Sequence, residues 1–404
     1  MSVSQLVVLA CSAGMLAGLA AAAGGPAKAL LAADFEKDPR KAGWVGAADR
    51  GEFQGAWARA DDDSRGRFLR VEKGHWQSPA AAVEPFAYYR LRFRSKAVAD
   101  GYWAAFFANA DGNQLQADHY DSLPGSRAWA EREYCFRANV DAASVQVRFQ
   151  ARRYPLAVDD VHIERIDRPA AAAWADKVYA ALPPVSYTPP PDRGKLLPGT
   201  MARLRTGPAL RVVMLGDSIA NDTSHSCLDV LLERAQPKCR VEWVNSVRGG
   251  TGCAWYRQED RIARYVLPYR PDLLIIAGIS SGYGWEDIRE VIRQVRAASG
   301  CEIMVLTGCV HPRVQGEINF VENTEMPRDD ACEVILRFPQ RLATMCAEEK
   351  VELMDIRKAW DDYIAASPMP HAWYLRDPIH ANTRGKQILG RILLRYLGPG
   401  KEKG

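Results

Sequence analysis

Three side chains of the types that can together perform nucleophilic catalysis stand at two distant places in this 404-residue chain. Gly216-Asp217-Ser218 directly follows a mostly apolar run at residues 211–215, whereas Asp377 and His380 stand close together near the other end. A serine hydroxyl needs an imidazole to take its proton, and the imidazole needs a carboxylate to fix its tautomer and charge. The pattern therefore predicts attack on an ester by Ser218, with His380 as the base and Asp377 as the residue that orients it.

The elements that must position these residues are a parallel sheet and the helices around it. Strand and helix in alternation predict a doubly wound sheet, with Ser218 at its carboxyl edge, where such folds keep their sites. A helix at residues 386–394 is expected to hold Asp377 and His380 against the core. Strands are predicted at residues 212–215, 241–244, 273–277, 303–307 and 351–356, and further helices at 228–232, 285–298 and 332–349.

Each motif also has an interpretation without chemistry. Gly, Asp and Ser are common turn formers, so Gly216-Asp217-Ser218 alone is frequent in loops, and an Asp-Pro pair alone is typical of a surface turn. The conjunction favours catalysis, because the serine follows a predicted buried strand and the acid and base precede a predicted helix.

Four segments resemble the sequence blocks of the SGNH (GDSL-type) hydrolases and occur in the same order. They are residues 216–222, 245–250, 278–281 and 377–380. The resemblance spans roughly residues 206 to 398. It implies a flavodoxin-like α/β fold, an esterase or carbohydrate deacetylase activity, and an oxyanion held by the backbone N–H groups of Ser218 and Gly250. It implies no metal ion in the hydrolase site and no cofactor.

The third block departs from the family. Where the family has Gly-x-Asn-Asp, this chain reads Gly278-Ile279-Ser280-Ser281, so the asparagine that completes the oxyanion hole is missing. The hydroxyl of Ser280 is one candidate for the third donor. Asn221, just beyond the nucleophile, is its rival.

Four further residues near predicted strand ends are candidates for substrate binding. Arg248 would contact an acidic sugar, Trp255 and Tyr256 would stack on a sugar ring, and His311 would reach the acyl or sugar group. The alternative for His311 is a turn residue without a task.

Composition excludes several classes of function. The chain is 48% hydrophobic and 25% charged, which is typical of a folded soluble protein, and its net charge of +4 is too small to indicate nucleic-acid binding. No zinc-type Cys/His cluster occurs, and the glycines at residues 249–252 lack the lysine of a phosphate-binding loop.

The first residues resemble a targeting segment. Residues 6–23 are apolar and uncharged and precede small residues, so we expect a signal peptide at residues 1–29 and a secreted or periplasmic protein. The alternative is a membrane anchor, although no lasting membrane association is expected after cleavage. Of nine cysteines, Cys11 would leave with the signal; the even number left, eight, fits disulfides.

Residues 30–167 have the texture of an antiparallel sandwich. Alternating runs at residues 67–71, 88–93, 102–107, 145–149 and 158–163 are separated by turn-rich spacers. The pattern resembles jelly-roll carbohydrate-binding modules. Its tryptophans either stack on glycan or, as we favour, fill the core, and Asp34, Glu36 and Asp160 are candidate ligands of a structural calcium ion.

Residues 168–205 are predicted to form a helix and a proline-rich linker to the hydrolase domain at residues 206–398. Together these features predict an exported serine esterase that removes O-acetyl groups from polysaccharide or oligosaccharide through an acyl-enzyme. An acylated carbohydrate is its expected partner. The alternatives are a lipid or aryl esterase and, because of the missing asparagine, a catalytically impaired glycan-binding protein.

Overall fold

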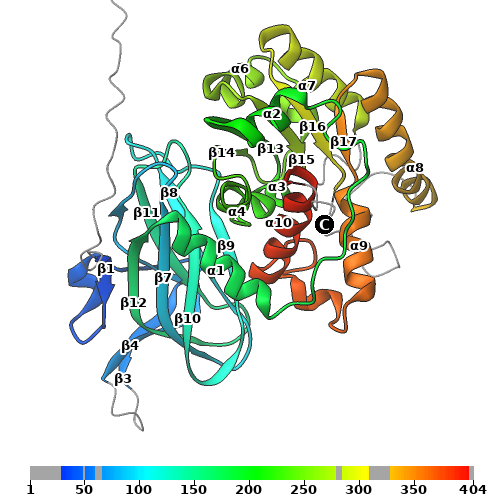
Figure 1. The fold of residues 1–404 in the computed structure, drawn as a ribbon. Coiled ribbons are helices and arrows are strands. Elements are labelled where there is room, and N and C mark those ends of the chain that lie inside the picture. Colours follow the sequence, from blue (N-terminus) through cyan, green and yellow to red (C-terminus); the bar gives the residue numbers. More distant parts are fainter. Residues whose placement is uncertain (1–28, 49–50, 60–65, 279–283, 309–327, 400–404) are drawn as a thin grey trace, which may run out of the picture.

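The computed structural model describes residues 29–48, 51–59, 66–278, 284–308 and 328–399, with only the backbone at residues 328–337. Two units of different architecture lie side by side, an all-β unit coloured from blue to bluish green and an α/β unit coloured from green to red (Figure 1). We refer to them as the sandwich and the α/β unit. Helix α1 (Arg168–Ala180) and an extended segment connect the two.

The sandwich consists of two six-stranded sheets whose strand pairs are antiparallel. Antiparallel pairing of the described strands in two facing sheets fits the predicted jelly-roll-like sandwich, and this prediction is confirmed. One sheet has the order β10 (Ser126–Arg137), β7 (Tyr88–Ala97), β12 (Leu156–Ile166), β4 (Arg67–Lys73), β3 (Gln54–Arg59), with β1 (Ala29–Ala33) beside β12. The other has the order β2 (Val45–Ala47), β5 (His75–Gln77), β11 (Ser144–Gln150), β8 (Gly101–Ala108), β9 (His119–Leu123), with β6 (Ala81–Ala82) beside β11.

The sandwich core follows from the period of two along its strands. In β11 every second residue is buried, and these residues face buried side chains of β7 such as Leu91 and Phe93. Of the five tryptophans, Trp44, Trp76 and Trp103 are buried in this core. The core interpretation of these three rings is therefore correct.

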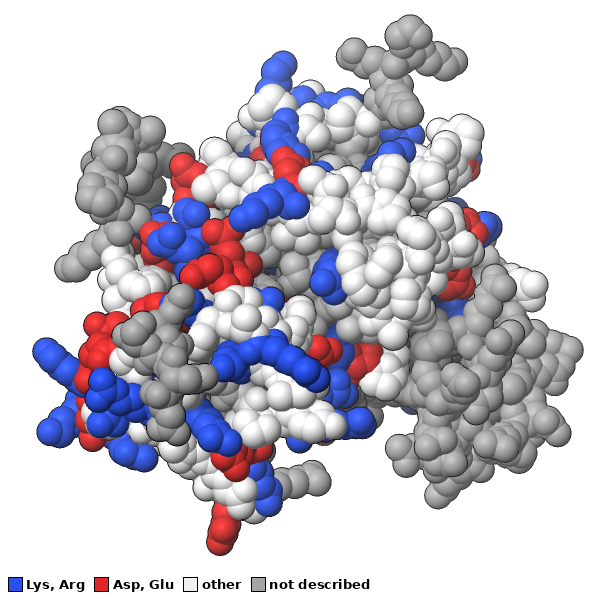
Figure 2. Space-filling view, turned by 90° about the horizontal axis from the view of Figure 1, so that it is seen from below, with Lys and Arg blue, Asp and Glu red and all other residues white. Residues whose placement is uncertain are grey.

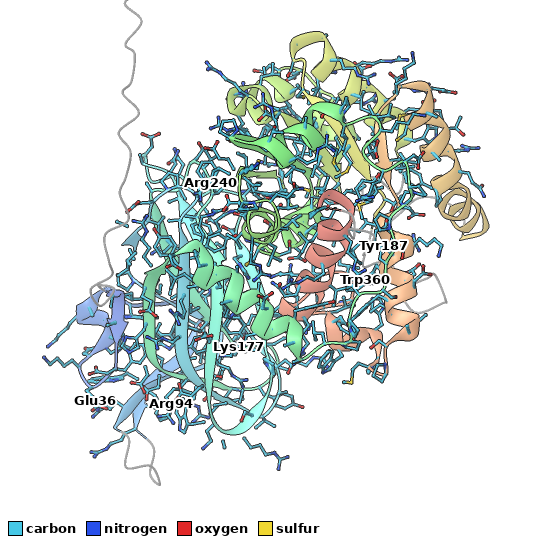
Figure 3. All side chains as sticks on the ribbon, viewed as in Figure 1. Glu36, Arg94, Lys177, Tyr187, Arg240 and Trp360 are labelled. Carbon is cyan, nitrogen blue, oxygen red and sulfur yellow. The ribbon has the colours of Figure 1, made fainter. Side chains whose placement is uncertain are left out.

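The structure does not assemble the expected calcium ligands. Asp34 accepts a hydrogen bond from Glu36 N, Glu36 accepts one from Arg67 N, and Asp160 faces Arg94 at 3.8 Å. Glu36 and Arg94 lie at the end of the sandwich away from the α/β unit (Figure 3). Because each carboxylate has a protein partner, and no trio of His, Cys, Asp or Glu within the described ranges is arranged to hold a metal, the calcium prediction is corrected.

The α/β unit is built on a five-stranded parallel sheet of order β14-β13-β15-β16-β17. Numbered from its own first strand, this order is 2-1-3-4-5, the flavodoxin-like arrangement, so the predicted fold class is confirmed. The strands are β13 (Ala209–Gly216), β14 (Arg240–Val247), β15 (Leu273–Ala277), β16 (Glu302–Leu306) and β17 (Glu352–Met354).

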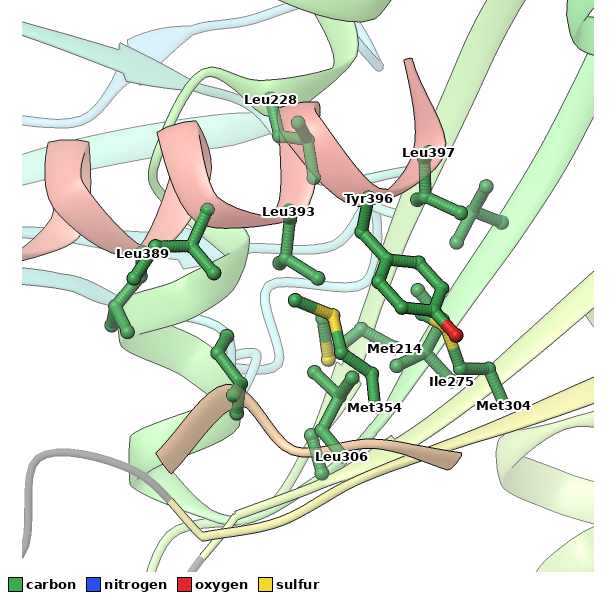
Figure 4. Close-up of a cluster of buried hydrophobic side chains, with 14 of the residues drawn as sticks. Met214, Leu228, Ile275, Met304, Leu306, Met354, Leu389, Leu393, Tyr396 and Leu397 are labelled. Carbon is green, nitrogen blue, oxygen red and sulfur yellow. The ribbon is translucent and has the colours of Figure 1, made fainter. Parts of the chain in front are cut away.

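Helices cover both faces of this sheet (Figure 1). Along β13, Val212 and Met214 point to one hydrophobic cluster, whereas Val213 and Leu215 point to the cluster on the other face. Figure 4 shows the first cluster, in which Leu389 and Leu393 pack towards the sheet. The helices are α2 (Pro198–Thr206), α3 (Ser218–Ser224), α4 (Leu228–Ala235), α5 (Cys253–Tyr256), α6 (Arg261–Tyr265), α7 (Trp285–Ala298), α8 (Arg328–Glu348), α9 (Ile356–Ala366) and α10 (Thr383–Leu397), with short 3-10 turns η1 (Pro39–Ala42), η2 (Leu267–Tyr269) and η4 (His371–Tyr374).

Buried charges join the sandwich to the α/β unit. Asp229 of α4 is 1% exposed and pairs with Arg137 of β10 at 3.1 Å and with Arg168 of α1 at 3.0 Å. Tyr88 of β7 also donates to this carboxylate. Burial would raise the pKa of Asp229, but the two guanidinium groups hold it below its usual value. The two units are therefore joined by buried ion pairs and a hydrogen bond as well as by the connecting segment.

The cysteines differ from the expectation. Those that the structure describes with side chains are free thiols, and most are buried, where a cysteine behaves as a small hydrophobic residue. Burial raises the pKa of Cys346 to about 12, which keeps it protonated. The disulfide prediction is therefore corrected for Cys135, Cys227, Cys239, Cys253, Cys301 and Cys346.

On the face shown in Figure 2, basic and acidic side chains are interspersed, as expected from the small net charge. None of the helices within the described ranges combines the length and hydropathy needed to span a bilayer.

Candidate active site

The structure brings Ser218, Asp377 and His380 together at the carboxyl edge of the parallel sheet. His380 Nε2 lies 2.8 Å from Ser218 Oγ, and His380 Nδ1 lies 2.8 and 2.9 Å from the two carboxylate oxygens of Asp377. This is the hydrogen-bonded order of a nucleophile, a general base and an orienting carboxylate. The arrangement can remove the serine proton and stabilise the imidazolium that results.

The nucleophile stands at a sharp turn from strand to helix. Ser218 is the first residue of α3, and the Asp217 carboxylate caps that helix by accepting from Ile219 N at 2.8 Å. Gly216 lets the turn pass close to β15, because a Cβ on it would stand 2.0 Å from the carbonyl of Ala277. The sequence Gly-Asp-Ser is thus explained position by position.

The acid and base share one turn, residues 376–380, which we call the acid–base turn. The Asp377 side chain accepts from Ile379 N at 3.1 Å and His380 N at 3.0 Å, and Arg376 N donates to His380 O at 3.0 Å. Burial would raise the pKa of Asp377, but hydrogen bonding to His380 and the charge of Arg376 keep it lower than usual. Asp377 therefore stays ionised beside the imidazole.

Gly250 lies in the turn that follows β14. This strand pairs with β13, the strand that leads to Ser218. Gly216 is level with Val247 in the sheet, and Arg248 N donates to Gly216 O at 2.9 Å, which ties this turn to the nucleophile. Gly250 has φ +67° with open space around its Cα, a conformation that glycine adopts readily. Its predicted role as an oxyanion donor stays a prediction.

The side-chain amide of Asn221 is hydrogen-bonded at both ends to groups outside the oxyanion hole. Its Nδ2 donates to the carbonyl of Asp118 at 2.6 Å, and its Oδ1 accepts from Asn245 Nδ2 at 2.6 Å. Because both ends of the amide hold the sandwich and β14 against α3, this rival assignment is corrected. Ser280, the other candidate, lies outside the described residues, and its role stays a prediction.

Of the candidates for substrate binding, Tyr256 is also corrected. Its ring is fully buried and its hydroxyl donates to Gly216 O at 2.8 Å, so it supports the nucleophile turn and cannot stack on a sugar. Trp255 is only partly buried, with the guanidinium groups of Arg248 and Arg261 over its ring at 5.0 and 3.8 Å. Roles for Arg248 and Trp255 stay predictions, and His311 lies outside the described residues.

The residues missed by sequence analysis surround Arg376. This arginine is 9% exposed, and its Nη1 donates to Asp222 Oδ1 at 2.5 Å and to the carbonyl of Ala381 at 3.0 Å. Its Nε lies 3.7 Å from Asp377 Oδ2. The sequence held one signal for this contact, the arginine directly before Asp377. A buried arginine needs an acidic partner, so an acidic residue such as Asp222 could have been sought for it.

Comparison with known proteins agrees with this geometry. The model of the GDSL-like Lipase/Acylhydrolase family matches residues 214–388, which include the whole triad. No curated protein matches the chain. The C-terminal half therefore contains a GDSL-like lipase/acylhydrolase (SGNH) domain, and the chain is a carboxylic-ester hydrolase.

Three solved structures show distant likenesses. A catalytic mutant of Axe2, an acetylxylan esterase from Geobacillus stearothermophilus, is 15% identical over 48% of this chain and 97% of that one, with a TM-score of 0.38. The CBM22-1 xylan-binding domain of Paenibacillus barcinonensis Xyn10C is 14% identical over 36% of this chain and 99% of that one, with a TM-score of 0.26. The enzymatically active domain of Bacteriophage CBA120 tailspike protein 4 is 14% identical over 30% of this chain, with a TM-score of 0.25. The match covers 19% of the length of the tailspike chain. Likenesses this weak establish neither a substrate nor a partner.

Proposed function

We propose that this protein is an exported serine esterase that removes O-acetyl groups from polysaccharide or oligosaccharide through an acyl-enzyme. The observation that carries the esterase part is the hydrogen-bonded chain from Ser218 Oγ through His380 to Asp377, with both links at 2.8 Å. Both distances allow hydrogen bonds, which is the geometry that a general base needs to activate a serine.

The chemistry follows from the positions of these atoms. Ser218 Oγ attacks the acyl carbonyl while His380 Nε2 takes its proton, and backbone N–H groups, those of Ser218 and Gly250, hold the oxyanion. The tetrahedral intermediate collapses as His380 returns the proton to the leaving sugar oxygen. A water molecule, deprotonated by His380, then attacks the acyl-enzyme and releases the carboxylic acid with Ser218 restored.

A hydroxyl-rich alcohol is favoured by the side chains that follow β14, the strand next to the nucleophile strand. Arg248 directly follows β14, and its guanidinium lies 5.0 Å from the centre of the partly buried Trp255 ring. A guanidinium group binds sugar hydroxyls well and acyl chains poorly, and an aromatic face can stack on a sugar ring. This polarity supports a carbohydrate ester over a lipid ester.

The export part of the proposal rests on the sequence alone. Residues 6–23 have the apolar, uncharged composition of a signal peptide core. N-terminal sequencing of protein recovered from the periplasm or medium tests it, and recovery of the uncleaved chain from the cytosol contradicts it.

The decisive experiment compares two substrate classes with the full chain and its Ser218→Ala variant. We expect acetate release from acetylated polysaccharide by the wild type alone, and slower hydrolysis of acylglycerols. Faster hydrolysis of acylglycerols would favour a lipid esterase. Binding of glycan without release of acetate by the wild type would show a glycan-binding protein with an impaired site.

A further inference from the structure

Two side chains of the sandwich contact the backbone of the acid–base turn from outside. The carbonyl oxygen of Arg376 accepts a hydrogen bond from the Tyr102 hydroxyl at 3.1 Å and a second from Arg152 Nη1 at 3.2 Å. Tyr102 belongs to β8, and Arg152 follows β11. Their side chains also contact one another, since the Arg152 guanidinium lies 5.1 Å from the centre of the Tyr102 ring.

Helix α10, which follows this turn, is anchored to the sandwich as well. Asp121 of β9 accepts from Thr383 N at 3.1 Å and from Thr383 Oγ1 at 2.5 Å, and its Oδ2 lies 3.2 Å from Lys386 Nζ. Asp121 and Lys386 are each 1% exposed. The segment that contains Asp377 and His380 is therefore bracketed by two attachments to the sandwich.

We propose that the sandwich is a positioning component of the active site, in which Tyr102 and Arg152 fix the Arg376 carbonyl and thereby the place of His380 opposite Ser218. Neither residue touches the reacting atoms, so both act through the acid–base turn. The two donors satisfy the two lone pairs of one carbonyl, which restrains the turn in two directions. This inference rests on the proposed ester hydrolysis, but it assigns to the sandwich a task other than recruiting glycan.

The expected consequence is a loss of turnover without a loss of substrate affinity. The Ser218 to His380 distance of 2.8 Å is the quantity that the two contacts protect, and small displacements in such a pair slow proton transfer. The free energy of one hydrogen bond to a carbonyl, if it is lost in the transition state, typically corresponds to a rate change of about threefold to tenfold.

The test uses full-length Tyr102→Phe and Arg152→Gln variants with a small acetyl ester such as 4-nitrophenyl acetate. We expect each variant to lower kcat about threefold to tenfold with KM unchanged, and Arg152→Lys, which keeps a donor, to recover part of the loss. The matched controls are Tyr154→Phe and Arg153→Gln, two exposed neighbours in the same loop, which should change kcat less than twofold.

Two outcomes would overturn the inference. If Tyr102→Phe and Arg152→Gln keep the wild-type kcat on the small ester and lose activity only on the polymer, the two residues bind substrate. If kcat falls equally in the control variants, the effect is not specific to the turn.

The rate at which a serine-directed phosphonate labels Ser218 separates this inference from the proposed function. A wild type that hydrolyses no ester contradicts the proposed function. The labelling rate still reports the position of His380, and equal rates in wild type and in both variants would contradict the positioning role.

Discussion

The two halves of the triad are held in place by different parts of the molecule. The nucleophile turn is supported from within the α/β unit, by the cap at Asp217, the close approach of Gly216 to β15, and the hydroxyl of Tyr256. The acid–base turn instead has supports from the sandwich, at the Arg376 carbonyl and, just beyond the turn, at Thr383 of α10. The nucleophile turn itself is held locally and its helix meets the sandwich farther on, at Asn221 of α3, whereas the sandwich contacts the acid–base turn directly.

This difference changes the expected role of the sandwich. A tethered recruiting module shares few contacts with its enzyme, but here Asp229 and Lys386 of the α/β unit have buried charge partners in the sandwich. A fragment of residues 206–404 would leave both charges without those partners, so we expect it to lose stability and activity on every substrate rather than on polymers alone. We therefore expect the sandwich and the α/β unit to behave as one enzyme.

The largest loss of kcat should come from removing the side chain of Ser218 or His380. Ser218→Ala and His380→Ala should each lower kcat by about 10⁴- to 10⁶-fold, because the relay fails when either member is missing. Asp377→Asn should retain more activity, since the Ser218–His380 pair remains. Steady-state kinetics on a small acetyl ester measures the loss, and phosphonate labelling that persists in Ser218→Ala would contradict the assignment.

The next largest effect should come from Asp121, the anchor between the sandwich and α10. Asp121→Ala removes the main partner of the buried Lys386 ammonium and should lower the free energy of unfolding by about 3 to 5 kcal/mol. Adding Lys386→Met should recover part of the loss because the unpaired charge is gone. Urea denaturation measures both, with the exposed Asp111→Ala as the control. A loss below about 1 kcal/mol would show that the two units are only loosely joined.

The sequence predicted the parts of the molecule that depend on neighbouring residues. Buried strands read as continuous apolar runs, so β13, β14, β15 and β16 were predicted within a few residues, and the Asp-x-x-His spacing places both side chains on one turn. Helix α3 was not predicted, because its seven residues carry no apolar period and its start depends on the cap at Asp217.

Long-range partners could not be predicted in the same way. Asn221 seemed free for the oxyanion, and Tyr256 seemed free for a sugar, because a sequence does not show that Asp118 and Gly216 lie beside them in space. The acid–base turn depends on residues more than 200 positions away, such as Tyr102. Residues 30–167 have the composition of a separate module, so the sequence did not indicate that the sandwich contacts the acid–base turn.

The pH dependence of stability tests the interface at Asp118, whose carbonyl binds Asn221. Burial raises the pKa of the Asp118 carboxyl to about 7. Because the pKa is higher in the folded than in the unfolded state, this group's contribution to stability is present at pH 4 and is lost as the pH rises through 7. The free energy of unfolding of Asp118→Asn, taken relative to that of the wild type, should therefore rise by about 2 to 4 kcal/mol from pH 4 to pH 8.

Burial lowers the pKa of the nearby His119 and His225, which gives the opposite trend in the same pH range. Both histidines are present in the wild type and in Asp118→Asn, so their contributions cancel in the difference between the two denaturation curves. A difference that does not change between pH 4 and pH 8 would show that Asp118 is solvated, and that this part of the interface is open.

The smallest effect should come from Tyr256, the support of the nucleophile turn that corresponds to Tyr102. Tyr256→Phe removes one hydrogen bond to the Gly216 carbonyl, which keeps a second donor in Arg248 N at 2.9 Å. We therefore expect a loss of about 0.5 to 1.5 kcal/mol in the free energy of unfolding. We expect kcat to stay within about threefold of the wild type, because the cap at Asp217 still fixes Ser218.

The neighbouring Tyr265→Phe serves as its control, since Tyr265 packs against Tyr256 at 5.7 Å between ring centres. If the nucleophile turn is local and redundant while the acid–base turn depends on the sandwich, Tyr102→Phe must lower kcat more than Tyr256→Phe does, measured on the same small ester. The reverse order would mean that the buried nucleophile turn is the more delicate half. The sandwich would then act through stability, and the distinction between a local and an interfacial half of the triad would not hold.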